Sequence, residues 1–124
     1  MQKIIIEQTP KMPGILFDPD EGKLEIIGNS IPEDANSFYR PIAEAINEYF
    51  KSPKPLTKIK FDLEYFNSSS SKWFMNILKL VKTNLKTGVS VEIDWYYDEN
   101  DEDMGDVISD YKAILQLPIN IKKK

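Results

Sequence analysis

The sequence predicts a two-layer α/β fold in which a mixed sheet of about four to six strands carries three helices mainly on one face. Apolar and polar residues alternate over 58–65 and again over 89–97, which is the period of a half-buried strand. Between them, apolar residues of 74–85 recur every three or four positions, which is typical of an amphipathic helix. A strand–helix–strand order predicts parallel neighbouring strands. Because such strands are continuously apolar when both faces are covered, the alternation predicts helices on one face and solvent on the other.

Three short strands are predicted before the first helix. Residues 3–8 and 15–17 form the first two strands, and residues 23–27 form the third. The turn at 18–22 holds a proline, which fixes φ, and a glycine, which permits a positive φ. The second and third strands therefore form a hairpin, which is expected to end at Gly28-Asn29-Ser30.

The first helix is predicted to begin at a cap formed by Asp34 or Ser37, because short polar side chains accept free backbone N–H groups there. Pro41 would cost about 3 kcal/mol in a helix interior, so it is expected in the first turns or at a kink. The apolar stripe of this helix comprises Phe38, Ile42, Ala45, Ile46 and Tyr49. The prolines within 52–55 end the helix before the next strand.

Two further helices and an edge strand complete the prediction. The second helix spans 68–86, with Gly88 as the left-handed residue that ends it. The acidic run 98–103 opens the third helix, where carboxylates of the first turn complement the helix dipole. The stripe of this helix comprises Val107, Ile108, Tyr111, Ile114 and Leu115. An edge strand follows at 117–121, and the lysines of 122–124 are expected to form a frayed tail.

Size and charge fit one globular domain over residues 1–124, and the absence of cysteine fits a cytoplasmic protein. A chain of 124 residues is long enough for a single core, and its 41% hydrophobic and 29% charged residues are typical of globular proteins. The net charge of −4 argues against a nucleic-acid partner. No apolar run approaches the roughly 20 residues of a membrane-spanning helix, so we expect no membrane partner.

The chain has neither histidine nor cysteine, and this excludes several catalytic classes. Triads of the Ser-His-Asp or Cys-His type, histidine metal sites and thiolate chemistry all need one of these residues. The phosphate-binding loops Gly-x-x-x-x-Gly-Lys and Gly-x-Gly-x-x-Gly are also missing. We therefore predict a protein that is not an enzyme and that needs no cofactor.

Four consecutive serines follow Asn67 in the turn between the strand at 58–65 and the second helix. One residue of this turn is expected to cap the helix, and the other serines can be filler in its first turn. A second interpretation is that one serine accepts a phosphate, because a helix N-terminus tolerates an added anion. A phosphate at this position would change the surface that a partner meets without unfolding the helix.

Two alternatives belong to other functional classes. A small metal-dependent enzyme could bind magnesium through Asp98, Asp101 and Glu102. The acidic run does not match a calcium loop, since Asp103 and Ser109 stand where such a loop needs glycine and glutamate. The other alternative is a purely structural subunit that is held through an exposed sheet edge.

Aromatic residues gather at the strand ends and beside the serines. Trp73 lies at the edge of the apolar stripe of the second helix, and Phe66 and Tyr96 are out of phase with the apolar strand positions. Ordinary core packing is the simpler account of these rings. The alternative is a partner-binding surface that includes Tyr65, Phe66, Trp73 and Tyr96, because aromatic residues are enriched at protein contacts.

The run Tyr65-Phe66-Asn67-Ser68-Ser69-Ser70-Ser71-Lys72 follows a signature of tyrosine, a hydrophobic residue, asparagine, serine or threonine, two serines, any residue and lysine. Three further stretches, at 9–28, 28–35 and 95–98, fit the same pattern in order. In these stretches the chain resembles the SiaC family of bacterial regulatory phosphoproteins. The resemblance covers nearly the whole chain.

The resemblance implies a STAS-like domain, similar to anti-anti-sigma factors, with a phospho-acceptor at a helix start. It places the acceptor on Ser68 and matches Asn67, Ser69, Ser70 and Lys72 to the surrounding motif, with Ser69 and Ser70 as alternative acceptors. It further implies a protein kinase, a PP2C-type phosphatase and an effector such as a diguanylate cyclase, which binds the unphosphorylated form. Such partner switching would connect the chain to cyclic-di-GMP signalling and biofilm regulation.

Overall fold

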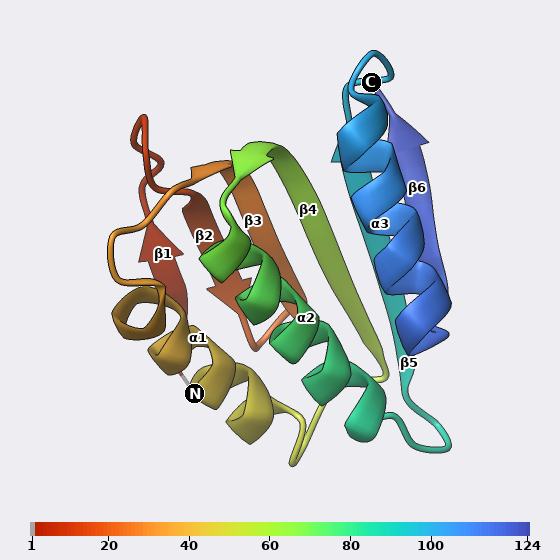
Figure 1. The fold of residues 1–124 in the computed structure, drawn as a ribbon. Coiled ribbons are helices and arrows are strands. Elements are labelled where there is room, and N and C mark those ends of the chain that lie inside the picture. Colours follow the sequence, from red (N-terminus) through yellow and green to blue (C-terminus); the bar gives the residue numbers. More distant parts are fainter. Residues whose placement is uncertain (1) are drawn as a thin grey trace.

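One six-stranded sheet and three helices build the structure, a computed structural model that describes residues 2–124 (Figure 1). The elements in chain order are β1 (Ile4–Ile6), β2 (Gly14–Asp18), β3 (Lys23–Ser30), α1 (Ala35–Tyr49), β4 (Leu56–Phe66), α2 (Ser68–Thr83), β5 (Ser90–Tyr97), α3 (Glu102–Leu115) and β6 (Ile119–Lys123). The α/β class, the three helices and the mixed sheet predicted from the sequence are confirmed.

The strands lie in the sheet in the same order as in the chain. Strands β1, β2 and β3 pair antiparallel, and β3 to β6 pair parallel. The three crossovers therefore all step in one direction across the sheet, and right-handed crossovers of this kind place their helices on one face. Figure 1 shows α1, α2 and α3 together on that face. The opposite face, called here the helix-free face, carries charged side chains such as those of Lys58 and Glu92, as the alternation predicted.

The core between the sheet and the helices is rich in aromatic rings. Phe61, Phe74 and Trp95 are fully buried, and the rings of Phe61 and Trp95 stack with their centroids 4.1 Å apart. Burial of a side chain of this size contributes about 1.5–3 kcal/mol, so this cluster fixes α2 against β4 and β5. Every helix within residues 2–124 is too short or too polar to cross a lipid bilayer.

A bulge near the end of β4 reverses the side-chain alternation that the sequence showed. Leu63 lies opposite Gly28 of β3, but Asn29 lies opposite Tyr65, so β4 contains one extra residue between these pairs. Tyr65 is therefore exposed, with 56% of its surface accessible, and Phe66 packs on Phe74 with a centroid distance of 5.1 Å. The alternation over 58–65 put Tyr65 on the apolar side and Phe66, out of phase with it, on the solvent side. Both placements were wrong, because period-two counting cannot detect an inserted residue.

Element ends account for the other differences from the sequence prediction. Strand β3 continues through Gly28 to Ser30, where it pairs with Phe66 instead of ending early. Helix α2 ends at Thr83, before residue 86, and Gly88 takes its positive φ of 87° in the turn beyond the helix. The predicted lysine tail is part of β6 as far as Lys123, because β5 offers a parallel edge to pair with.

The predictions for the start of α1 agree with the structure. Asp34 is the cap, and its carboxylate accepts the backbone N–H of Ser37 at 3.1 Å. Pro41 lies inside the helix, in its second turn and on the exposed side, and because proline has no backbone N–H it donates no hydrogen bond to the helix ladder.

Candidate functional site

The serine turn, residues 67–71, lies where β4 ends and α2 begins. The backbone N–H of Asn67 donates to the carbonyl oxygen of Ser30 at 3.0 Å, and its side-chain amide donates to the carbonyl oxygen of Pro32 at 3.4 Å. Ser30 is the last residue of β3 and Pro32 lies two residues beyond it, and β3 is the neighbour of β4 in the sheet. The two hydrogen bonds of Asn67 therefore fix the start of the turn to the end of β3.

Asn67 caps α2, and the serines occupy the first helical positions. Its side-chain oxygen accepts the backbone N–H of Ser70 at 3.0 Å and the hydroxyl of Ser69 at 3.0 Å. Its backbone is extended, with φ −83° and ψ 175°, as a cap requires, and Ser68 is the first residue of the helix. The sequence left the cap open between serine and asparagine, and the structure assigns it to asparagine.

Ser70 points into the protein, where it belongs to a buried chain of hydroxyl groups. Its Oγ lies 2.7 Å from Oγ of Ser30 and donates to the Ser30 carbonyl oxygen at 3.1 Å. The Ser30 hydroxyl lies 2.5 Å from the hydroxyl of Tyr39 on α1. These contacts fit a chain in which Tyr39 donates to Ser30 and Ser30 donates to Ser70. Burial raises the pKa of Tyr39 to about 12, so the phenol stays protonated at neutral pH.

Sequence reasoning missed Ser30 and Tyr39 as neighbours of the serine turn. Forty residues separate Ser30 from Ser70, so only the pairing of β3 with β4 brings them together. The inward orientation of Ser70 could have been predicted from the sequence. Ser70 lies on the same helix face as Phe74 and Ile77, which belong to the apolar stripe of the second helix. Ser70 is fully buried, and a hydroxyl in this position is closed to solvent.

Ser71 is half-buried and faces α3. Its hydroxyl contacts the hydroxyl of Tyr111, which also donates to the Ser71 carbonyl oxygen at 3.1 Å. Burial raises the pKa of Tyr111, so this phenol also stays protonated near neutral pH. The two inward serines thus fix the turn to α1 and to α3 respectively.

Ser68 and Ser69 point outward, and both are exposed. The hydroxyl of Ser69 is engaged by the side chain of Asn67, whereas the cap makes no use of the hydroxyl of Ser68. The first turn of α2 contains no acidic residue, and its cap is neutral. The positive end of this helix dipole is therefore not balanced by a charged side chain in its own first turn, which favours an anion at this position.

The four aromatic residues of the predicted partner surface do not form one patch. Tyr65 is exposed at the end of β4, and Phe66 beside it is half-buried against the core. The indole N–H of Trp73 donates to the side-chain oxygen of Asn36 at 2.8 Å, which places this ring in the seam between α1 and α2. Tyr96 lies on the helix-free face, where the ammonium group of Lys60 is 5.1 Å from its ring centroid.

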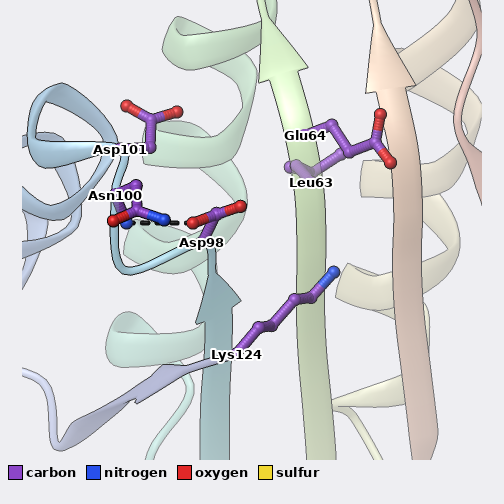
Figure 2. Close-up of a pocket in the computed structure, with 6 residues that line it drawn as sticks. All are labelled: Leu63, Glu64, Asp98, Asn100, Asp101 and Lys124. Atoms are coloured by element: carbon purple, nitrogen blue, oxygen red, sulfur yellow. Dashed lines mark hydrogen bonds between the residues drawn. The ribbon is translucent and has the colours of Figure 1, made fainter.

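The acidic run forms a turn and the cap of one helix. Asp101 caps α3, since its carboxylate accepts the backbone N–H of Met104 at 3.0 Å. The carboxylate of Asp98 accepts the backbone N–H of Asn100 at 2.9 Å (Figure 2). Within residues 2–124, no three carboxylates are grouped in a way that could hold a metal ion. The proposed magnesium ligands Asp98, Asp101 and Glu102 are therefore not assembled into a site.

A hollow of about 530 Å³ nonetheless lies at the end of β4 and β5 (Figure 2). Lys124 extends into it from the end of β6 and forms an ion pair with Asp62 of β4. The residues that line the hollow are Leu63, Glu64, Asp98, Asn100, Asp101 and Lys124. The hollow is open to solvent and its wall is polar, so it is a surface feature of this end of the sheet.

Known proteins match both the sequence and the fold. The family model for the SiaC family regulatory phosphoprotein matches residues 6–124. An uncharacterized protein of Pseudomonas aeruginosa strain UCBPP-PA14 is 25% identical over 122 residues, which are 98% of this chain and 97% of that protein. Apo-SiaC from Pseudomonas aeruginosa superposes with a TM-score of 0.89 at 24% identity, covering 98% of this chain and 99% of that chain. A structure of diguanylate cyclase SiaD in complex with its activator SiaC, also from Pseudomonas aeruginosa, contains a chain that matches with the same TM-score, identity and coverage.

Proposed function

The chain belongs to the SiaC family of regulatory phosphoproteins, and from this premise we propose that it is a cytoplasmic, non-enzymatic signalling protein switched by phosphorylation of Ser68. A protein kinase adds the phosphate and a PP2C-type phosphatase removes it. The modification decides whether the domain, residues 1–124, binds its effector. The observation that carries this proposal is that Ser68 is exposed at the first helical position of α2, directly after the uncharged capping residue Asn67.

The surroundings of the four serines favour Ser68 over its neighbours as the acceptor. Ser70 is fully buried, and the hydroxyl of Ser71 contacts Tyr111. Ser69 is exposed, but its hydroxyl donates to the capping side chain of Asn67, so its modification would disturb the cap. A phosphate on Ser68 leaves these hydrogen bonds in place and meets the positive end of the helix dipole.

The proposed effector is a diguanylate cyclase, bound by the unphosphorylated form. Pseudomonas aeruginosa SiaC, which has the same fold, is described as the activator of the diguanylate cyclase SiaD. Binding controlled in this way would connect the chain to cyclic-di-GMP signalling and biofilm regulation. A binding surface next to the switch would include Tyr65 and Trp73, since these flank the serine turn in the chain and keep exposed or half-exposed rings.

Phosphopeptide mapping tests the acceptor directly. The protein is incubated with its cognate kinase and ATP, digested and analysed by mass spectrometry, alongside the variants Ser68→Ala and Ser69→Ala. We expect wild type and Ser69→Ala each to carry one phosphate, located on the peptide that contains residue 68. We expect Ser68→Ala to carry no phosphate. Full phosphate incorporation into Ser68→Ala would overturn the assignment.

The effect on the effector is tested with matched variants of the same residue. Titration calorimetry with the cognate cyclase compares wild type, Ser68→Ala and Ser68→Asp, with Ser69→Asp as the control for an added charge one residue away. We expect Ser68→Ala to bind as wild type does and Ser68→Asp to bind at least about tenfold more weakly. Equal affinity of all four proteins would indicate a structural subunit instead of a switch.

A further inference from the structure

Strand β4 has a free edge over its last four residues. Its pairing with β5 runs from Leu56 to Asp62, whereas its pairing with β3 continues to Phe66. Figure 1 shows β4 and β5 diverging toward this end of the sheet. Over 63–66 the edge of β4 that faces β5 is therefore without a strand neighbour in the part of the chain that the structure describes. Such an edge offers backbone N–H and carbonyl groups in a row, which is a template for another strand.

Two hollows lie along this free edge and share Asp101. The first is the hollow of about 530 Å³ described above, which includes Leu63 and Glu64 of β4. The second, of about 270 Å³, is lined by Tyr65, Phe66, Asp101, Asp103, Met104 and Val107. We call the two together the β4 edge cleft. One wall is the end of β4, and the other is the loop after β5 with the first turns of α3.

The cleft is acidic along its length and apolar at one end. Glu64, Asp98, Asp101 and Asp103 contribute four carboxylates, and the one ammonium group in the lining, that of Lys124, is paired with Asp62. Phe66, Met104 and Val107 form the apolar end. Helix capping accounts for Asp101 but not for Glu64, which belongs to β4, nor for the exposed ring of Tyr65 at the margin.

We infer that the β4 edge cleft binds an extended segment of a partner protein in which basic and apolar side chains alternate. The segment would add as a strand to the free edge of β4, because main-chain hydrogen bonds are what an unpaired edge can offer. Four edge residues correspond to about 13 Å of strand, a short recognition segment. Successive side chains of a strand point to opposite sides, so lysine or arginine can face the carboxylates while alternate apolar residues fill the end beside Phe66.

This inference goes beyond the proposed function and does not depend on it. Ser68 lines neither of the two hollows. A segment bound in the cleft would therefore still be recognised by a variant that cannot accept a phosphate.

Selection from a displayed library of random ten-residue peptides tests the inference without knowledge of the partner. The target proteins are wild type, the charge-reversed double variant Glu64→Lys/Asp103→Lys and the control double variant Glu44→Lys/Asp110→Lys. Both double variants change the net charge equally, but Glu44 and Asp110 are exposed and lie outside the cleft. Circular dichroism melting curves first establish that all three proteins are folded.

We expect selected peptides in which lysine or arginine alternates with valine, isoleucine, leucine or phenylalanine. They should bind wild type, Ser68→Ala and the control variant alike, and bind the charge-reversed variant about tenfold more weakly. Proline at alternate positions should abolish binding, and the amide signals of residues 63–66 should shift on titration. The inference is overturned if no peptide is enriched, if the enriched peptides lack basic residues, if the charge-reversed variant binds equally well, or if the shifted amides all lie outside the β4 edge cleft.

Discussion

Helices α2 and α3 begin with the same capping geometry, but the start of α2 is neutral and the start of α3 is negatively charged. In each, a side chain accepts the backbone N–H three residues ahead at 3.0 Å, Asn67 for Ser70 and Asp101 for Met104. The cap of α3 is charged, and Glu102 and Asp103 follow it in the first turn, whereas the first turn of α2 holds no acidic residue. The dipole of α3 is thus already balanced by its own side chains. The start of α2 is a place where negative charge can be added and removed.

A second contrast lies within the serine turn itself. Four residues of one type occupy four environments, because the helix turns each by about 100° relative to the last. Ser70 and Ser71 point inward and hold the turn to α1 and α3, while Ser68 and Ser69 point to solvent. Substitutions at these neighbouring positions should therefore have effects that differ greatly in size.

The largest effect is expected when a carboxylate replaces the buried hydroxyl at Ser70. In Ser70→Asp the new charge would replace a buried hydroxyl whose partners are the hydroxyl and the carbonyl oxygen of Ser30, neither of which is a cation. An unpaired buried charge of this kind lowers the free energy of unfolding by about 3–5 kcal/mol. Urea unfolding followed by circular dichroism measures the change, and Ser69→Asp serves as the exposed control. Similar losses in both variants would contradict the inward orientation of Ser70.

The next effect concerns the pH dependence of stability through Tyr39. Burial raises its pKa from 10.0 to about 12, so the unfolded state loses the phenolic proton first as the pH rises. The stabilising contribution is complete below pH 10 and is lost between about pH 10 and 12, amounting to about 2–3 kcal/mol. Urea unfolding at several pH values, compared between wild type and Tyr39→Phe, isolates this contribution. A loss of the same size in both proteins would assign the pH dependence to other groups.

Removal of the cap should have an intermediate effect. Asn67→Ala leaves the backbone N–H of Ser70 without its acceptor and should lower the free energy of unfolding by about 1 kcal/mol. Asn67→Asp keeps the acceptor and adds a charge at the N-terminus of α2 but loses the amide donor to Pro32, so it should be more stable than Asn67→Ala. Thermal unfolding of the three proteins checks this order. An Asn67→Ala variant as stable as wild type would show that the backbone hydrogen bond from residue 67 to the Ser30 carbonyl oxygen suffices to place the turn.

The sequence was sufficient for those parts of the fold that depend on local periodicity. Alternation over 58–65 and 89–97 predicted two neighbouring parallel strands, and their half-polar pattern predicted helices mainly on one face. The bulge after Leu63 could not be predicted, because it depends on how β3 and β4 pair. The same limit applies to the site. The position of the serine turn follows from the change of period, but the hydroxyl chain of Ser30, Ser70 and Tyr39 exists only once β3, α1 and α2 have packed.

The smallest effect is the one that bears most directly on the proposed switch. Ser68→Asp places a carboxylate in the first turn of α2, where it should raise the free energy of unfolding by about 0.3–1 kcal/mol in dilute buffer. The reverse change at α3, Glu102→Gln with Asp103→Asn, should lower it by a similar amount. Both effects should shrink in 1 M salt, where the Debye length is about 3 Å.

Unfolding in urea at low and high salt separates this dipole effect from any change in packing. If Ser68→Asp were destabilising at both salt concentrations, the start of α2 would not accept added charge, and a phosphate there would act by disrupting the helix. If Ser68→Asp stabilises in dilute buffer alone, the domain can carry a phosphate on Ser68 with its fold unchanged. Any loss of effector binding would then arise at the contact surface, because the structure that presents this surface would be the same in both states.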